Sequence, residues 1–114
     1  MGGKIDFRGF LSPQVLQRFG AYMLKHQTQA DGNLRASDNW KKGIPKEEYL
    51  SSLLRHVMDY WRMVEEGLDE EGVLTAAVIA AWEDTLQDLL CAMFFGVQGL
   101  LYERLKSRVG VKTS

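Results

Sequence analysis

The chain has 114 residues, 46% of them apolar, which suits one domain with a hydrophobic core and leaves too little for two. A net charge of −1 excludes the strong basic excess of most proteins that bind duplex nucleic acid, so we expect no such partner. The single cysteine, Cys91, excludes an intramolecular disulfide and favours a reducing compartment, and its apolar neighbours predict that it is buried. We predict one domain over residues 1–114, with flexible ends at 1–11 and 109–114.

The first predicted helix begins at Ser12-Pro13, where serine is a good N-cap and proline fits the first helical position. Residues 1–11 show no clear period. After the proline, apolar residues recur at helical spacing, namely Val15, Leu16, Phe19, Tyr22 and Met23. We expect this helix to end near Gln29.

A polar stretch without periodicity follows over residues 31–45, and connections of this length in a compact domain are usually functional or disordered. The stretch contains side chains suited to stacking on a base, binding a phosphate or hydrogen-bonding a ligand, which are Arg35, Asn39, Trp40, Lys41 and Lys42. These residues predict a site for a nucleotide-sized anion. The alternative for Trp40 is that its ring covers the core from outside.

A second predicted helix opens at Pro45 and ends at Gly67. Its apolar residues form a wide stripe that needs core on more than one side, made of Tyr49, Leu50, Leu53, Leu54, Val57, Met58, Trp61 and Val64. Arg55 and His56 project about 100° apart on such a helix, so they cannot both face the core. We predict that Arg55 binds a phosphate and that His56 faces the ligand or orients an acid. The alternative for Arg55 is a surface ion pair with Asp59.

An acidic turn over 68–72 precedes a third periodic apolar region, 73–106, which is either one long helix or two pieces that meet near 82–85. Gly96 and Gly99 lie inside this region. Each glycine costs about 1 kcal/mol relative to alanine in a helix, which indicates a packing or a ligand reason for its presence.

The longest apolar segments, 73–82 and 89–101, are expected to be too short or too interrupted to span a membrane. The N-terminus lacks the apolar core of a signal peptide. We therefore expect a soluble cytoplasmic protein with no membrane partner.

Three carboxylates, Glu83, Asp84 and Asp88, form the strongest acidic set in the last helical region. Asp84 and Asp88 are four residues apart, so both emerge on one helix face, where like charges repel. A Mg2+ ion would relieve this repulsion and leave positions for water and phosphate oxygens, as a metal-assisted pyrophosphohydrolase requires. The alternative is a solvated acidic face. Net charges of +2 over 31–46 and −5 over 59–71 suit either a ligand bound as its metal complex or two solvated surfaces.

Several of these residues resemble a known family. The run Asp-Asn-Trp-Lys-Lys-Gly-Ile-Pro over 38–45, the later Leu-Leu-Arg-His over 53–56, and Glu83-Asp84 before a final apolar helix are similar to small phage and prophage dATP/dGTP diphosphohydrolase N-terminal domains. The likeness covers about residues 22–106. This family looks related to the all-α NTP pyrophosphatases (MazG-like), whose helices hold acidic residues that bind Mg2+ around a nucleoside triphosphate.

The resemblance implies a Mg2+-dependent deoxynucleoside triphosphate pyrophosphohydrolase in the cytoplasm of an infected or lysogenic bacterium. Glu83 and Asp84 would then be catalytic, and both would bind the metal together with Asp88. The chain departs from the family at Gly96, where members tend to carry asparagine, and the ExxE and ExxD pairs of MazG-like enzymes are not cleanly present in it. Loss of metal ligands would convert a hydrolase into a binder. The alternative function is therefore a non-catalytic sponge that sequesters a cyclic or ADP-ribose-derived host immune signal.

We predict an all-α bundle of three to four helices. A homo-oligomer is expected, because the apolar demand of the last helix exceeds what two partner helices easily cover. The predicted function is binding of a purine nucleotide, with phosphate contacts from Lys41, Lys42 and Arg55. A third possibility is a structural helical module that uses Trp40 and the last helix in a protein interface.

Overall fold

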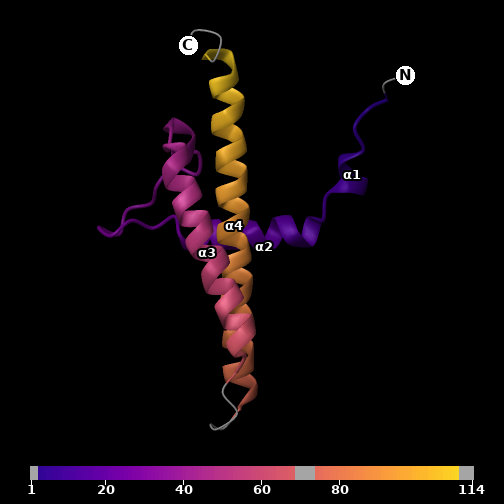
Figure 1. Cartoon of the computed structure of the whole chain (residues 1–114), viewed down its shortest axis with the longest axis vertical. Helices are drawn as coiled ribbons and strands as arrows, with labels where there is room; N and C mark the ends of the chain where they lie inside the picture. The colour runs from indigo at the N-terminus through magenta and orange to yellow at the C-terminus, as the bar shows by residue number, and fades with distance from the viewer. Residues whose placement is uncertain (1–2, 69–73, 111–114) are drawn as a thin grey trace. The chain divides into compact units, whose positions relative to one another are not determined.

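The computed structural model describes residues 3–68 and 74–110, the side chains of the second stretch as far as Lys106. The described residues are mainly helical and contain no β-strand, which confirms the all-α class. The elements in chain order are α1 (Phe7–Phe10), α2 (Pro13–Lys25), the one-turn 3-10 helix η1 (Asn39–Lys42), α3 (Lys46–Glu66) and α4 (Ala76–Gly110) (Figure 1). The chain divides into two compact units, Met1–Ala36 and Ser37–Ser114.

The first unit contains two helices that begin with side-chain caps. Asp6 Oδ1 accepts a hydrogen bond of 3.0 Å from the Gly9 amide, which starts α1 in a segment where the sequence shows no period. Ser12 Oγ accepts a hydrogen bond of 3.2 Å from the Val15 amide, so the predicted start of α2 at Ser12-Pro13 is confirmed.

The end of α2 lies earlier than expected. The helix stops at Lys25, because residues 27–35 form a small hairpin that takes up the next backbone groups. The Gln29 amide donates to the Asn33 carbonyl at 2.7 Å across this hairpin. Gly32 closes its tip with a φ of +86°, a conformation that L side chains rarely adopt.

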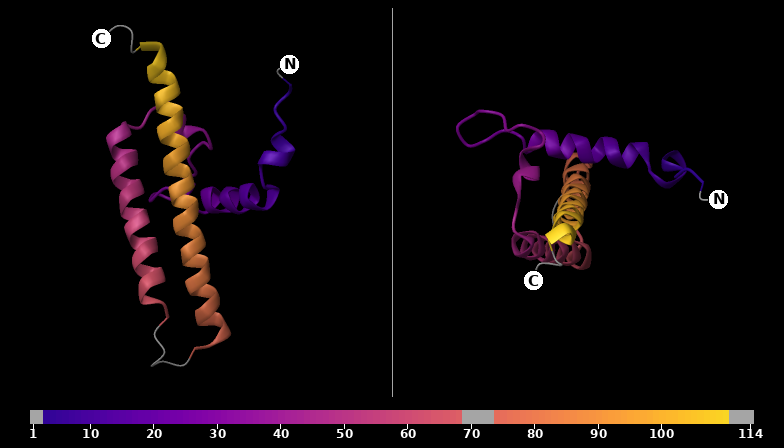
Figure 2. Two further views of the ribbon diagram at one scale, coloured as in Figure 1. Left: turned by 45° about the vertical axis from the view of Figure 1, so that its right-hand side comes forward. Right: turned by 90° about the horizontal axis from the view of Figure 1, so that it is seen from above.

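The second unit is an antiparallel pair of long helices (Figures 1 and 2). α3 begins directly after Pro45 and stops at Gly67, whose φ of +64° suits a C-terminal glycine, so both predicted ends are confirmed. α4 is one continuous helix that passes through 82–85 without a break and continues to Gly110. Most of the predicted acidic turn and the last four residues lie outside the described residues.

α3 and α4 meet along side chains spaced alternately three and four residues apart, which is the spacing of a helix seam. We call these residues the inner seam. On α3 they are Tyr49, Leu53, His56, Tyr60 and Met63, and on α4 they are Trp82, Leu86, Leu89, Met93, Gly96, Leu100 and Glu103, all buried or half-buried. Cys91 is also buried, as predicted.

One of the two glycines inside α4, Gly99, has a packing role. A Cβ atom on Gly99 would run into the ring of Tyr49, so only glycine lets the two helices approach at this level. A Cβ atom on Gly96 would lie 3.5 Å from the Leu53 side chain, an ordinary van der Waals contact. The contact at Gly99 confirms the packing explanation for that glycine. The two contacts together fix the alignment of the helices, since Tyr49 lies opposite Gly99 and Leu53 opposite Gly96.

By length and composition, the stretch Ala76–Lys106 of α4 could cross a membrane. The segment 89–101 and the part of the segment 73–82 from Ala76 onward belong to this one helix, so the expectation that the apolar segments are too short is wrong for α4. Core helices of soluble proteins share these properties, and the helix alone is weak evidence about location. Cytoplasmic localisation therefore stays a prediction.

Candidate functional site

The predicted ligand-binding loop contains η1, whose Trp40 side chain packs against α4. The Trp40 ring meets Tyr102 edge-on with centroids 4.9 Å apart and Phe95 with centroids 6.0 Å apart. The alternative in which Trp40 covers the core is confirmed, and stacking of Trp40 on a base stays a prediction. Lys41 Nζ lies 5.7 Å from the centroid of the Trp40 ring. Asn39 and Lys42 are exposed on the same helical turn as Trp40. This turn lies beside the part of α4 between Phe95 and Tyr102.

One side of the α3–α4 hairpin is formed by residues one position before the inner seam on each helix. Because the helices are antiparallel, the same sense of rotation from the seam brings both sets to one side of the pair. We call the charged residues and the serine and threonine of this set the polar face, which comprises Glu48, Ser52, Arg55, Asp59, Arg62, Thr85 and Asp88. Phe95 and Tyr102 occupy equivalent positions further along α4, so Trp40 lies on the same side.

Arg55 is exposed near the middle of the polar face. Asp59 pairs with Arg62 in place of Arg55: its Oδ1 accepts a hydrogen bond of 3.2 Å from Arg62 Nη2. The alignment of α3 with α4 places Arg55 between the levels of Asp88 and Phe95. An exposed guanidinium at this position can reach a phosphate on a ligand that lies along the hairpin.

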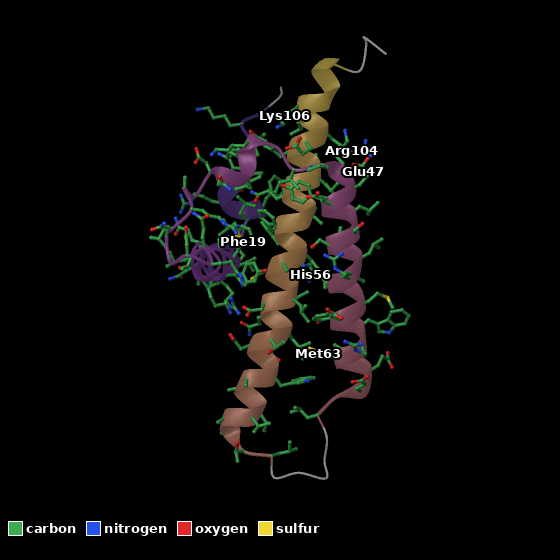
Figure 3. All side chains as sticks on the ribbon, turned by 90° about the vertical axis from the view of Figure 1, so that its left-hand side faces the viewer. Phe19, Glu47, His56, Met63, Arg104 and Lys106 are labelled. Carbon is green, nitrogen blue, oxygen red and sulfur yellow. The ribbon has the colours of Figure 1, made fainter. Side chains whose placement is uncertain are left out.

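His56 occupies the inner seam and turns toward α4 (Figure 3). Its Nε2 lies 3.3 Å from Ser52 Oγ, and either atom can donate, depending on the tautomer. Ser52 is a site residue that the sequence analysis missed, although its spacing of four residues from His56 on one helix is the signal for this contact. The Ser52 contact holds the imidazole beside the polar face.

The three predicted metal ligands do not point in one direction. Glu83 and Asp88 are five positions apart, so their side chains leave α4 about 140° apart. Glu83 Oε1 instead accepts from Gln87 Nε2 at 3.4 Å. Asp84 and Asp88 share a side of the helix, as predicted. Among the described side chains, no three His, Cys, Asp or Glu residues come together in a group that could hold a metal ion.

The predicted ligand residue Arg35 belongs to the first unit. Its amide donates to the Gln27 carbonyl at 2.9 Å, and its carbonyl accepts from Gln27 Nε2 at 2.6 Å. The Arg35 backbone therefore closes the hairpin after α2. The residues that the second unit brings to one side are Trp40, Lys41, Lys42 and Arg55. Asp88 is on the same side, about two helical turns, or roughly 10 Å, along α4 from Phe95, which Trp40 contacts.

A buried hydroxyl lies between the helices at the end of the hairpin that η1 covers. Tyr49 is 3% exposed, and its hydroxyl oxygen has no hydrogen-bond partner among the described residues. Burial, and then the negative charge of Glu103, raises the pKa of Tyr49 above its usual 10.0. Glu103 Oε2 lies 3.1 Å from Lys106 Nζ, without the alignment of a hydrogen bond.

The raised pKa of Tyr49 predicts a loss of stability at alkaline pH. Above pH 10 the unfolded chain releases the tyrosine proton while the folded chain retains it, so the free energy of unfolding falls as the pH rises. Tyr49→Phe should lack this part of the decline. Urea unfolding of both proteins at neutral and alkaline pH measures the difference, and equal declines would contradict the assignment.

Comparisons with known proteins identify no relative of this chain. No family model, curated protein or solved structure matches the chain. The resemblance to phage diphosphohydrolase domains therefore stays a prediction.

Proposed function

We propose that the protein binds a purine nucleotide through its phosphates on the polar face and leaves it intact. The observation that carries this proposal is the exposed guanidinium of Arg55, which lies on the same side of the hairpin as η1 and its cations Lys41 and Lys42. Two lysines and an arginine can neutralise a di- or triphosphate, and Arg55 can contact two of its oxygens at once.

The arrangement of carboxylates supports binding over hydrolysis. A pyrophosphohydrolase needs a metal that polarises the phosphoryl oxygens and a carboxylate that orients the attacking water. Glu83 leaves α4 on the side away from Asp88, so among the described residues α4 offers the pair Asp84 and Asp88 rather than three converging ligands. The pair lies roughly 10 Å or more along α4 from η1. A metal ion bound to Asp84 and Asp88 would therefore lie too far away to contact the same phosphate oxygens as Lys41 or Lys42.

The proposal is tested by equilibrium dialysis of the protein against dATP, dGTP, a cyclic dinucleotide and ADP-ribose, each with Mg2+ and with EDTA. Nucleotide that is retained in EDTA and recovered unchanged after heating of the protein supports binding without turnover. Release of pyrophosphate that requires Mg2+ would establish the hydrolase, and Asp84→Ala should then abolish it. No retention of any of the four compounds would contradict both functions.

Arg55→Ala is expected to weaken nucleotide binding about tenfold or more, because a charge-assisted hydrogen bond contributes about 1.5–3 kcal/mol. Arg62→Ala is the matched control, since Arg62 is the same residue type on the same face, one heptad closer to the end of α3. Titration calorimetry of the three proteins with the retained nucleotide measures the effect. Equal losses in both variants would indicate general electrostatic attraction instead of a site at Arg55.

A further inference from the structure

A second apolar stripe runs along the α3–α4 hairpin outside the inner seam, and we call it the outer stripe. On α3 it consists of Leu50, Leu54, Val57, Trp61 and Val64, spaced alternately four and three residues apart. On α4 it continues with Leu90, Phe94, Val97 and Leu101 at the same spacing. These nine side chains are between 38% and 58% exposed. Alternating spacings of three and four residues are typical of a helix surface that packs against another helix.

Both halves of the outer stripe lie on one side of the hairpin. Each stripe residue follows an inner-seam residue by one position, a rotation of about 100° in the same sense on both helices. Because α3 and α4 are antiparallel, this rotation brings both halves to the same side, opposite the polar face. The nine exposed fractions amount to roughly 800 Å² of apolar surface, more than the ~300–600 Å² of the largest patch on a typical monomer.

A two-fold axis can be placed near the middle of the stripe on each helix. On α3, Leu50 and Val64 lie seven residues on either side of Val57. On α4, Leu90 and Val97 lie equally far from a point next to Phe94. The alignment of Tyr49 with Gly99 and of Leu53 with Gly96 places Val57 two to three residues, or roughly 4 Å, from the Phe94 level. One two-fold axis perpendicular to the helices can therefore serve both.

We propose that the outer stripe binds a second copy of this chain, with α3 against α3 and α4 against α4 of the partner, all antiparallel, about an axis near Val57 and Phe94. The result is a four-helix bundle made of two hairpins, with the same patch used on both subunits. The exposed apolar area matches the roughly 800 Å² per partner of a standard stable interface. This dimer does not depend on nucleotide binding, since the polar face remains open.

The charges at the ends of the stripe fit the same axis. On α4 the stripe positions continue to Glu83 at one end and Arg104 at the other. The midpoint between them lies next to Phe94, so the axis brings Glu83 of one subunit opposite Arg104 of the other. Arg104 lies at the same end of the hairpin as Glu47, which continues the stripe on α3 (Figure 3). A parallel arrangement of the two α4 helices would instead place like charges together.

Sedimentation equilibrium of the full chain over a micromolar concentration series tests the proposal. The expected species is a dimer of the 13.0 kDa chain. Val97→Glu is expected to raise the dimer dissociation constant by about a hundredfold, because it buries a charge in the interface. Leu24→Glu on α2 is the control, since Leu24 is an exposed apolar residue outside the stripe, and should leave dissociation unchanged. Circular dichroism of each variant confirms its helix content.

Two further variants test the arrangement without depending on the stability of Val97→Glu. In Val57→Cys the new thiols lie close to the axis, so a short bis-maleimide should link two chains, whereas Leu24→Cys should give little linked product. Glu83→Arg and Arg104→Glu should each weaken the dimer, and the double variant should restore it. A wild-type monomer throughout the series, a dimer indifferent to Val97→Glu, or a monomer that floats with lipid vesicles would overturn the proposal.

Discussion

Tyr49→Ala is expected to destabilise the second unit by about 3–5 kcal/mol, the range measured when a large core aromatic side chain is truncated. Tyr49 is 3% exposed, its ring packs against Phe95 with centroids 5.8 Å apart, and it fills the space that Gly99 leaves. Domains of this size have a total stability of only about 5–15 kcal/mol, so this single change should lower the melting temperature greatly. Urea unfolding monitored by circular dichroism, at one fixed protein concentration, measures it.

Tyr49→Phe is the matched control for the alanine variant. It retains the ring and removes a buried hydroxyl that lacks a hydrogen-bond partner among the described residues and lies near the negative charge of Glu103. Removal of an unpaired buried polar group should leave the stability unchanged or raise it by about 1 kcal/mol. A loss comparable to that of Tyr49→Ala would show that the hydroxyl is bonded in solution.

Gly99→Ala is expected to lower the stability by about 1–3 kcal/mol, the usual cost of inserting an extra group into a packed core. The change is informative because alanine is the better helix former by about 1 kcal/mol, so propensity alone predicts the opposite sign. The new methyl group would run into the Tyr49 ring, which also packs against Phe95. The two helices would have to separate at this level.

Gly96→Ala separates the packing effect from the propensity effect. Its methyl group would lie 3.5 Å from Leu53, an ordinary contact, so the higher helix propensity of alanine should stabilise α4 by up to about 1 kcal/mol. Thermal melting of both glycine variants beside the wild type gives the comparison. If both variants were stabilised, the close approach of Tyr49 to Gly99 would not exist in solution.

Local signals account for the parts of the fold that the sequence predicts correctly. Ser12-Pro13 starts α2 and Gly67 ends α3 because each residue acts through its own backbone and its nearest neighbours. The early end of α2 could not be predicted, because it depends on hydrogen bonds across the hairpin 27–35. The sequence left open whether α4 continues through 82–85. No glycine or proline lies there to break the helix, and the structure shows it unbroken.

The site was harder to predict than the helices. The sequence names Arg55, Asp88 and Trp40 as residues of the right chemistry, but their relative levels depend on the alignment of α3 with α4. That alignment is set by one close contact between residues fifty positions apart, Tyr49 and Gly99. The divergence of Glu83 from Asp88, by contrast, follows from helix geometry alone and was accessible from their spacing.

The close contact of Tyr49 with Gly99 also bears on how the hairpin avoids folding out of register. Seams that repeat every seven residues can slide by one heptad and still match apolar with apolar residues. Seven residues before Gly99 the chain carries Ala92, whose methyl group would meet the tyrosine ring in such a slipped pairing. The glycine therefore marks one alignment among several that the apolar pattern alone would permit, and a single missing methyl group gives the chain one folded hairpin instead of a mixture.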